Sequence, residues 1–215
     1  MARSSLIWVF FFLAFPIQAA DENKSKNNWS DSPYGPMLER IIPPGFTPKM
    51  LAEPASRGAR LTRQYCVQCH NLANPAMHDA ARWPSVVRRM VPRMQGKGNM
   101  GKLMVDMMAG VQAPSTDETE AIVAYLARHG QKPIDPKRIP EVNAPSAEPF
   151  RLACGQCHVL PDPRRHTAKE WPAVVARMQK NMEWMNRVVG SKPAPDELQL
   201  RIEDINAFLI RYARR

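Results

Sequence analysis

The chain carries one short motif twice, and each copy of the motif begins a longer internal repeat. Residues 66–70 and 154–158 both read Cys-x-x-Cys-His, and together they hold all four cysteines of the 215-residue chain. With a constant offset of 88, positions 66–94 match positions 154–182 at 15 of 29 places without a gap. A repeat in two copies indicates two small domains of one kind, because a solenoid needs more copies to bury its core.

The repeat continues past the motif. Besides the cysteines and histidines of the motif, the identical pairs are Gln68 and Gln156, Leu72 and Leu160, Pro75 and Pro163, His78 and His166, Ala80 and Ala168, Trp83 and Trp171, Pro84 and Pro172, Val86 and Val174, Val87 and Val175, Arg89 and Arg177, Met90 and Met178, and Met94 and Met182. A match resumes with an offset of 83 between 122–128 and 205–211. The first copy therefore has five extra residues, 88 minus 83, in the Met- and Gly-rich stretch 95–114, which reads largely as loop.

The residue pattern predicts an all-α fold. No run of alternating β-branched residues reaches strand length, and each copy offers three helices. The first helix carries the motif, and the second covers about 84–91 in one copy and 172–188 in the other. Pro92 is expected to end the second helix of the first copy. The third helix begins near Asp117 or Asp196, where acidic residues suit a helix N-terminus.

We divide the chain into five parts. Arg3 precedes the apolar run 6–15, and Ala19 and Ala20 follow it, so residues 1–20 read as a signal peptide. A retained signal acting as a membrane anchor is the alternative. The other parts are a Pro-rich tail at 21–56, which we expect across the first domain, a first domain at 57–130, a linker at 131–149 and a second domain at 150–215. The five prolines of the linker predict an extended, semi-rigid spacer.

The motif predicts one covalently bound haem c in each copy. The two thiols lie about one helical turn apart and form thioethers with the haem vinyl groups, while the next imidazole binds the iron. The attachment residues are Cys66 and Cys69 with His70, and Cys154 and Cys157 with His158. A redox dithiol would favour a βαβ setting, and a zinc site would join both pairs, so the duplication disfavours both alternatives. Haem also supplies the stabilisation that a domain of about 70 residues needs.

With these motifs the chain, from Arg57 onward, resembles small helical bacterial cytochromes c of the class I type, in a diheme tandem. The segment Trp-Pro-x-Val-Val-x-Arg-Met, followed by Ile-x-x-Tyr/Phe-Leu, is similar to the cytochrome subunits that accept electrons from periplasmic dehydrogenases such as sulfite dehydrogenases. The resemblance implies two small helical domains, and iron held by His on one side and Met on the other. The second copy departs from the family because no Met stands in its glycine-rich loop, which leaves the sixth ligand open.

We expect Met90 and Met178 to be the sixth ligands. A thioether favours ferrous iron and raises the reduction potential, which suits a carrier that accepts electrons from a dehydrogenase. The resemblance places a Met seven residues after the Trp, and this pair of Met residues recurs in both copies. The alternatives are Met94 with Met182, one turn further along the same helical face, and His78 with His166, which otherwise bind a propionate or cap the next helix.

The preferred function is single-electron transfer between redox proteins in the periplasm, without enzymatic activity. A diheme enzyme of the peroxidase or thiosulfate dehydrogenase type is the alternative, but both copies offer a Met and neither haem is marked as catalytic. The charge of +10, from 30 basic and 20 acidic residues, is spread along the chain, which argues against nucleic-acid binding. Such a charge suits an acidic redox partner or an anionic membrane surface, and it equally favours solubility.

Overall fold

The computed structural model describes residues 31–189 and 201–215, and these residues are helical without a strand. This confirms the all-α class. The predicted signal peptide, 1–20, lies outside the described residues. The α-helices described are α1 (Gly35–Leu38), α2 (Arg57–Tyr65), α3 (Trp83–Met94), α4 (Lys102–Met107), α5 (Thr116–His129), α6 (Glu148–Cys154), α7 (Trp171–Val189) and α8 (Ile202–Arg211). None of them is long and apolar enough to cross a membrane.

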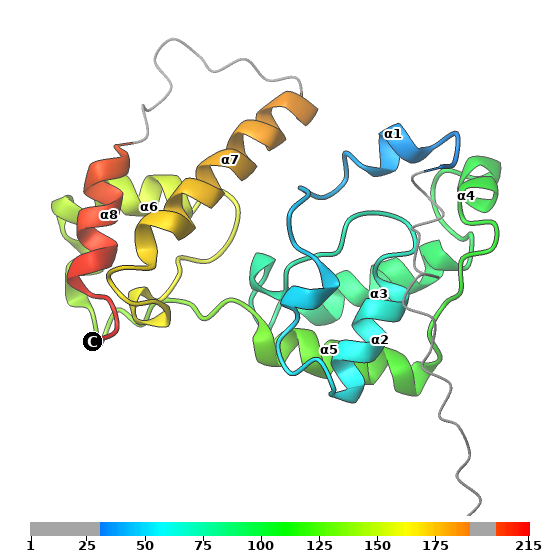
Figure 1. The fold of residues 1–215 in the computed structure, drawn as a ribbon, viewed down its shortest axis with the longest axis horizontal. Helices are drawn as coiled ribbons and strands as arrows, with labels where there is room; N and C mark the ends of the chain where they lie inside the picture. Colours follow the sequence, from blue (N-terminus) through cyan, green and yellow to red (C-terminus); the bar gives the residue numbers. More distant parts are fainter. Residues whose placement is uncertain (1–30, 190–200) are drawn as a thin grey trace, which may run out of the picture.

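The first half of the described chain packs around one hydrophobic cluster, in which α2 and α3 lie against α5 (Figure 1). Gly58 allows the close approach of α2 to α5, because a Cβ at this position would lie 2.3 Å from the Cβ of Tyr125. Ser115 begins α5 with a capping box, in which its hydroxyl and the Glu118 carboxylate each accept a backbone N–H. The buried members of the cluster are Leu51, Ala59, Leu61, Tyr65, Leu72, Trp83, Val87, Ile122, Tyr125 and Leu126.

Residues 31–56 lie against this first cluster. Leu51 is one of its buried members, and Phe46 packs on its edge. The Tyr125 hydroxyl donates a hydrogen bond to the Ala52 carbonyl (2.7 Å). Glu53 has a φ of 47°, a left-handed backbone conformation that is costly for a residue with a Cβ. Residues 46–53 of this stretch thus pack on the first cluster and on α5.

The second cluster is built from α6, α7 and α8 (Figure 1). Phe150 of α6 and Phe208 of α8 stack with their ring centroids 4.8 Å apart. The predicted spacer 131–149 is also part of this cluster, because several of its apolar side chains are buried in it. The buried members are Ile134, Ile139, Val142, Ala147, Phe150, Trp171, Val175, Ile205, Phe208 and Leu209, so the two clusters share no residue.

The helix boundaries correct the sequence prediction in three places. The first motif follows α2 instead of lying in it, since Cys66 caps the helix, whereas α6 reaches Cys154. Pro92 lies inside α3, which continues to Met94, because a proline in the last turn removes only one helical hydrogen bond. The stretch 95–114, expected largely as loop, contains α4. The predicted helix start at Asp196 lies outside the described residues.

Candidate functional sites

The two cysteine pairs lie in separate parts of the molecule. Cys66 packs against the first cluster and Cys154 against the second. All four cysteines are free thiols. Among the described residues no group of three or more His, Cys, Asp or Glu side chains gathers as a metal site. Because the pairs do not meet, the single zinc site considered from the sequence is not formed.

The thiols are not arranged as reactive groups. Burial raises the pKa of Cys66 to about 12, and the nearby Cys69 adds to the shift. Burial likewise raises the pKa of Cys154 to about 12 and that of Cys69 to about 11. A redox dithiol needs a thiolate near neutral pH, which these environments oppose. The raised pKa values therefore disfavour disulfide exchange at Cys66, Cys69 and Cys154.

Both motif histidines are held in the tautomer that a metal ligand requires. The Nδ1 of His70 lies 2.7 Å from the carbonyl oxygen of Asn71, and the Nδ1 of His158 lies 2.8 Å from that of Val159. A carbonyl only accepts, so Nδ1 carries the proton and Nε2 keeps its lone pair. Burial lowers the pKa of His70 despite its hydrogen bond to Asn71, which also favours the neutral imidazole that binds metals.

A tryptophan fixes the loop after each motif in the same way. The Nε1 of Trp83 donates to the carbonyl of Pro75 (2.8 Å), and the Nε1 of Trp171 donates to that of Pro163 (2.7 Å). Both tryptophans are buried and begin α3 and α7. The tryptophans that recur at an offset of 88 in the sequence thus make the same contact in both copies.

The recurring His78 and His166 pack on these tryptophans. Edge-to-face contacts join His78 to Trp83 (ring centroids 5.0 Å apart) and His166 to Trp171 (4.9 Å). The two histidines also end equivalent 3-10 turns, η2 (Pro75–Met77) and η5 (Pro163–Arg165). Each backbone carbonyl then accepts a hydrogen bond at the end of its copy, from Gln131 and from Arg214 respectively.

The four recurring methionines occupy half-buried places on α3 and α7. Met94 packs on the edge of the first cluster, while Met90 is not part of it. Met90 and Met178 hold equivalent positions, as the repeat predicts, two turns along their helices from Trp83 and Trp171.

Sequence reasoning missed Met108. Its Sδ lies 3.6 Å from the Sγ of Cys69, and the side chain is buried at 8% exposure. The segment is held there by a reciprocal pair, in which the side-chain amide of Gln68 donates to the Gln112 carbonyl (3.0 Å) and accepts from the Gln112 N–H (2.8 Å). The signal in the sequence was the extra Met-rich stretch of the first copy. Met104, one turn earlier and also buried, shares this inner face.

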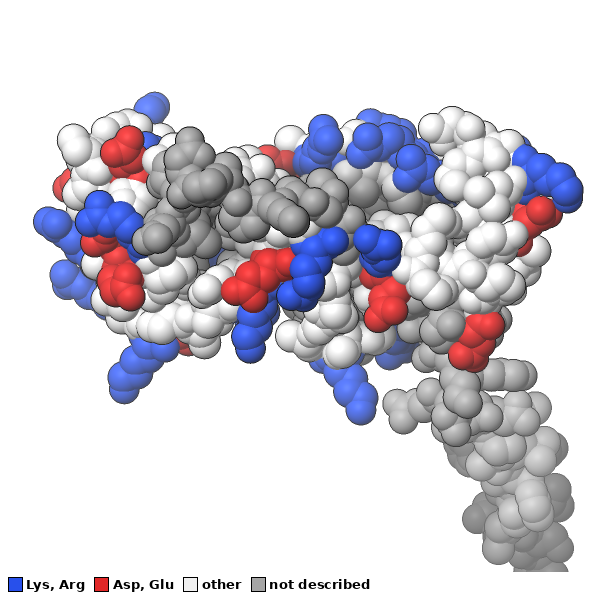
Figure 2. Space-filling model, turned by 90° about the horizontal axis from the view of Figure 1, so that it is seen from above, with Lys and Arg blue, Asp and Glu red and all other residues white. Residues whose placement is uncertain are grey.

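These side chains fit haem c. Each copy offers two thiols three positions apart in the sequence, an adjacent imidazole with Nε2 free of hydrogen bonds among the described contacts, and apolar walls from its own cluster. The surface charge is mixed: Figure 2 shows Lys and Arg scattered over one face, with Asp and Glu among them.

No known protein family, curated protein or solved structure matches the chain.

Proposed function

We propose that this protein is an exported diheme c-type cytochrome that carries single electrons between redox proteins. It comprises two tandem cytochrome c domains, 57–130 and 150–215. One haem is attached through Cys66 and Cys69 with His70 on the iron, and the other through Cys154 and Cys157 with His158. The observation that carries the proposal is the repetition of the whole arrangement: motif, Nδ1 hydrogen bond, Trp-to-Pro hydrogen bond and His–Trp contact.

When bound, the haem iron supplies reversible one-electron chemistry. The protein residues attach the haem and orient its ligands. The thiols hold the group permanently, and the carbonyls of Asn71 and Val159 orient the two imidazoles and increase their basicity. The clusters exclude water from one side of each site. Met90 and Met178 are the proposed sixth ligands, and their thioethers would stabilise ferrous iron.

A carrier is favoured over an enzyme because the two sites are alike. A catalytic haem would need an open position with acid or base groups beside it. Both copies instead present a recurring histidine on a tryptophan and recurring methionines on the following helix. The proposed setting is the periplasm, with an electron-donating dehydrogenase on one side and a terminal acceptor on the other. The distributed positive charge suits acidic partners.

Haem staining after denaturing electrophoresis, with the intact mass of the purified protein, tests this proposal. The expected mass includes two haems. Cys154→Ala is expected to keep the first haem unchanged and to hold the second by one thioether, which alters its pyridine haemochrome spectrum. Ser85→Ala, a partly exposed residue on α3, is the control and keeps both spectra. A parent protein that carries one haem or none would refute the proposal.

A further inference from the structure

The chain takes a different course in the two copies after the helix that the tryptophan begins. In the first copy α3 has 12 residues and ends at Met94, and the chain then turns at Gly96, whose φ is 70°. A Cβ on Gly96 would lie 3.3 Å from the Cα of Val105, so α4 returns close to this turn. In the second copy α7 continues for 19 residues, to Val189 (Figure 1). The first copy therefore folds back at a position where the second copy is still helical.

The returning segment covers the sulfur of the second cysteine in the first motif. We call residues 104–112 the cover segment. The Sδ of Met108 lies 3.6 Å from the Sγ of Cys69, and the Met108 side chain is 8% exposed. Gln68 fixes the segment through two hydrogen bonds between its side-chain amide and the backbone of Gln112. Cys69 thus lies under a neutral, apolar side chain that is held in place from the motif itself.

The corresponding part of the second motif is open to solvent. Cys157 and Gln156 are the counterparts of Cys69 and Gln68, and both are exposed, whereas Cys69 and Gln68 are half-buried. Leu152, two residues before the second motif, is exposed as well. The two motifs are therefore alike in sequence and differ in how far water reaches the second cysteine.

Water at a haem-attachment site changes the balance between the two oxidation states of the iron. Ferric haem carries one more positive charge than ferrous haem, and water stabilises the more highly charged form. A cover that excludes water disfavours the ferric form and so raises the reduction potential. A methionine thioether gives such a cover without adding a charge of its own.

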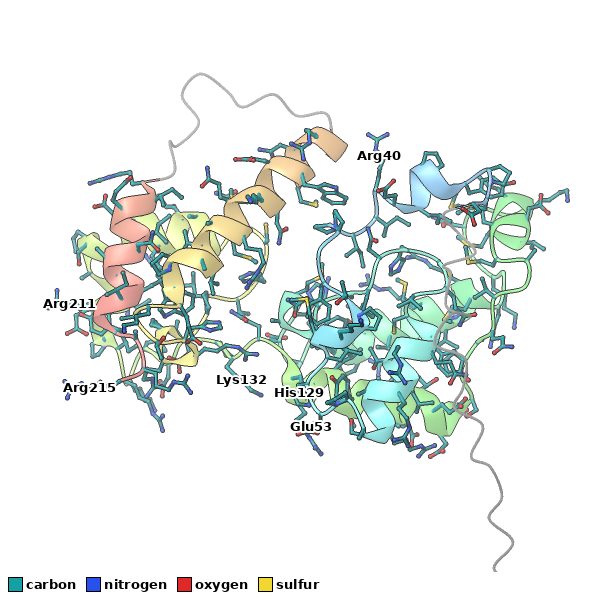
Figure 3. The ribbon with its side chains drawn as sticks, viewed as in Figure 1. Arg40, Glu53, His129, Lys132, Arg211 and Arg215 are labelled. Carbon is teal, nitrogen blue, oxygen red and sulfur yellow. The ribbon has the colours of Figure 1, made fainter. Side chains whose placement is uncertain are left out.

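Backbone hydrogen bonds join the two copies. The chain runs from the end of α5 at His129 past Lys132 toward the second cluster (Figure 3). The Gln131 N–H donates to the His78 carbonyl in the first copy (2.8 Å), and the Asp162 N–H of the second copy donates to the Lys132 carbonyl (2.9 Å). One short segment thus holds the loops that follow the two motifs, which favours electron exchange within one molecule.

We propose that Met108, with the cover segment, gives the first haem the higher reduction potential, so that an electron accepted at the exposed second haem moves on to the first. This inference rests on the proposed function. In the exchange one electron leaves the ferrous second haem, which is oxidised, and reduces the ferric first haem, and no bond or proton changes place. Met108 acts through the sulfur of Cys69 and is a positioning residue, not an iron ligand.

Redox titration of the haem-loaded protein, followed by optical spectra, tests the inference. Cys154→Ala, whose second haem is held by one thioether, identifies which step belongs to which haem, and the first haem of the parent is expected to have the higher potential. Met108→Gln keeps the side-chain length and places a polar amide against Cys69. The equilibrium constant for transfer from the second haem to the first is expected to fall about tenfold, which is about 59 mV for a one-electron couple. Met108→Leu restores an apolar cover and is expected to keep the parental potential.

Met107→Gln is the matched control, because the neighbouring Met107 is half-buried and lines a cavity with Tyr34. Both potentials are expected to stay unchanged in this variant. An unchanged first-haem potential in Met108→Gln would overturn the inference, as would a parent in which the second haem has the higher potential. A five-coordinate first haem in Met108→Leu would show that Met108 is an iron ligand and would overturn the role given to it.

A second pair of variants uses the repeat. Gln68→Ala removes both side-chain hydrogen bonds to Gln112, whereas Gln156→Ala removes only the exposed counterpart. Hydrogen exchange at the Gln112 N–H is expected to speed up about fivefold or more in Gln68→Ala. The first-haem potential is expected to fall in the same variant and to stay at the parental value in Gln156→Ala. Faster exchange without a change of potential opposes the inference.

Haem staining of the parent comes first, because it separates this inference from the proposed function. A parent without two haems refutes the proposed function. Two haems whose potentials do not respond to Met108→Gln and Gln68→Ala refute only the role of Met108 and the cover segment.

Discussion

At the scale of single residues, the two sites are alike around the imidazoles and differ around the sulfurs. The hydrogen bonds of His70 and His158 to the following carbonyls match within 0.1 Å (2.7 and 2.8 Å). In the part of the chain that the structure describes, only Cys69 has a methionine sulfur against it, because Met108 comes from the stretch that is longer in the first copy. Cys157, its counterpart, is exposed. We expect the two haems to differ in solvent exposure and therefore in reduction potential.

The choice between the recurring methionines is tested by two histidine substitutions. Met178→His is expected to keep the second haem six-coordinate but to lower its potential by on the order of 100 mV, because an imidazole stabilises ferrous iron less than a thioether does. Met182→His is expected to change it far less. Potentiometric titration followed by optical spectra measures both. The reverse ranking would assign Met94 and Met182 as ligands, and no change in either variant would favour His78 and His166.

The packing of Met108 predicts a stability effect. Met108→Ala removes a buried side chain between α4 and Cys69, and such truncations cost about 2 to 5 kcal/mol in a core. We expect a loss of unfolding free energy near the lower end of this range, about 2 kcal/mol, because the site lies near the surface. Met100→Ala, at 38% exposure, is the matched control and should stay within about 0.5 kcal/mol. Equal denaturant midpoints for the two variants would show that Met108 is not packed as described.

At the scale of helices, the contact between α2 and α5 depends on Gly58. An alanine there would place its Cβ 2.3 Å from the Tyr125 Cβ and 3.2 Å from the Ala121 carbonyl oxygen, so the two backbones must separate. Overpacking of this kind typically costs about 1 to 3 kcal/mol. Thermal unfolding of Gly58→Ala should show a clear fall in the midpoint. Gly98→Ala is the control, since its Cβ would meet only side-chain atoms at ordinary distances, the Met104 Cε at 3.4 Å, the Met104 Cγ at 3.6 Å and the Arg93 Cγ at 4.0 Å.

The repeat predicted the helices that carry matched residues and missed those that do not. Trp83 and Trp171 recur, and both begin a helix as a buried residue with the same hydrogen bond. The α4 helix has no counterpart in the pattern, and the glycines around it suggested a loop, but burial of Met104 and Met108 stabilises it. The prolines of 131–149 indicated an extended chain, yet they could not reveal that Ile139 and Val142 lie in the core. Such contacts depend on tertiary packing.

The haem-attachment residues could be predicted from the sequence, whereas the sixth ligands could not. Two Cys-x-x-Cys-His motifs define the attachment residues without a structure. The sixth ligand depends on which sulfur reaches the iron, and 13 methionines leave that choice to the fold. The proximity of Met108 to Cys69 joins residues 39 positions apart, which periodicity within one helix does not encode.

At the scale of the whole molecule, ionisable groups in both halves of the chain make the folding stability depend on pH. Hydrogen bonds from the Ser115 N–H and the Tyr65 hydroxyl hold the pKa of Glu118 below its ordinary value of 4.5. The Arg164 side chain lowers the pKa of Asp162 in the second half of the chain. In both cases the unfolded chain takes up a proton first as the pH falls, so folding stability falls with it.

These pKa shifts predict how the folding stability falls at acidic pH. The contribution of Glu118 is fully present above its unfolded pKa of about 4.5 and is lost as the pH falls through its lower folded pKa. Burial also lowers the pKa of His78 and His166 in the folded protein. The unfolded chain therefore takes up protons at these histidines from about pH 6.5 downward, and folding stability begins to fall at that pH. Guanidinium unfolding midpoints between pH 7 and 3 should decline in two stages. Glu118→Gln should lower the plateau and weaken the second stage, whereas Glu120→Gln, an exposed carboxyl on the same helix, should reproduce the parent curve. A parent midpoint that stays level down to pH 3 would contradict the assignment of these groups.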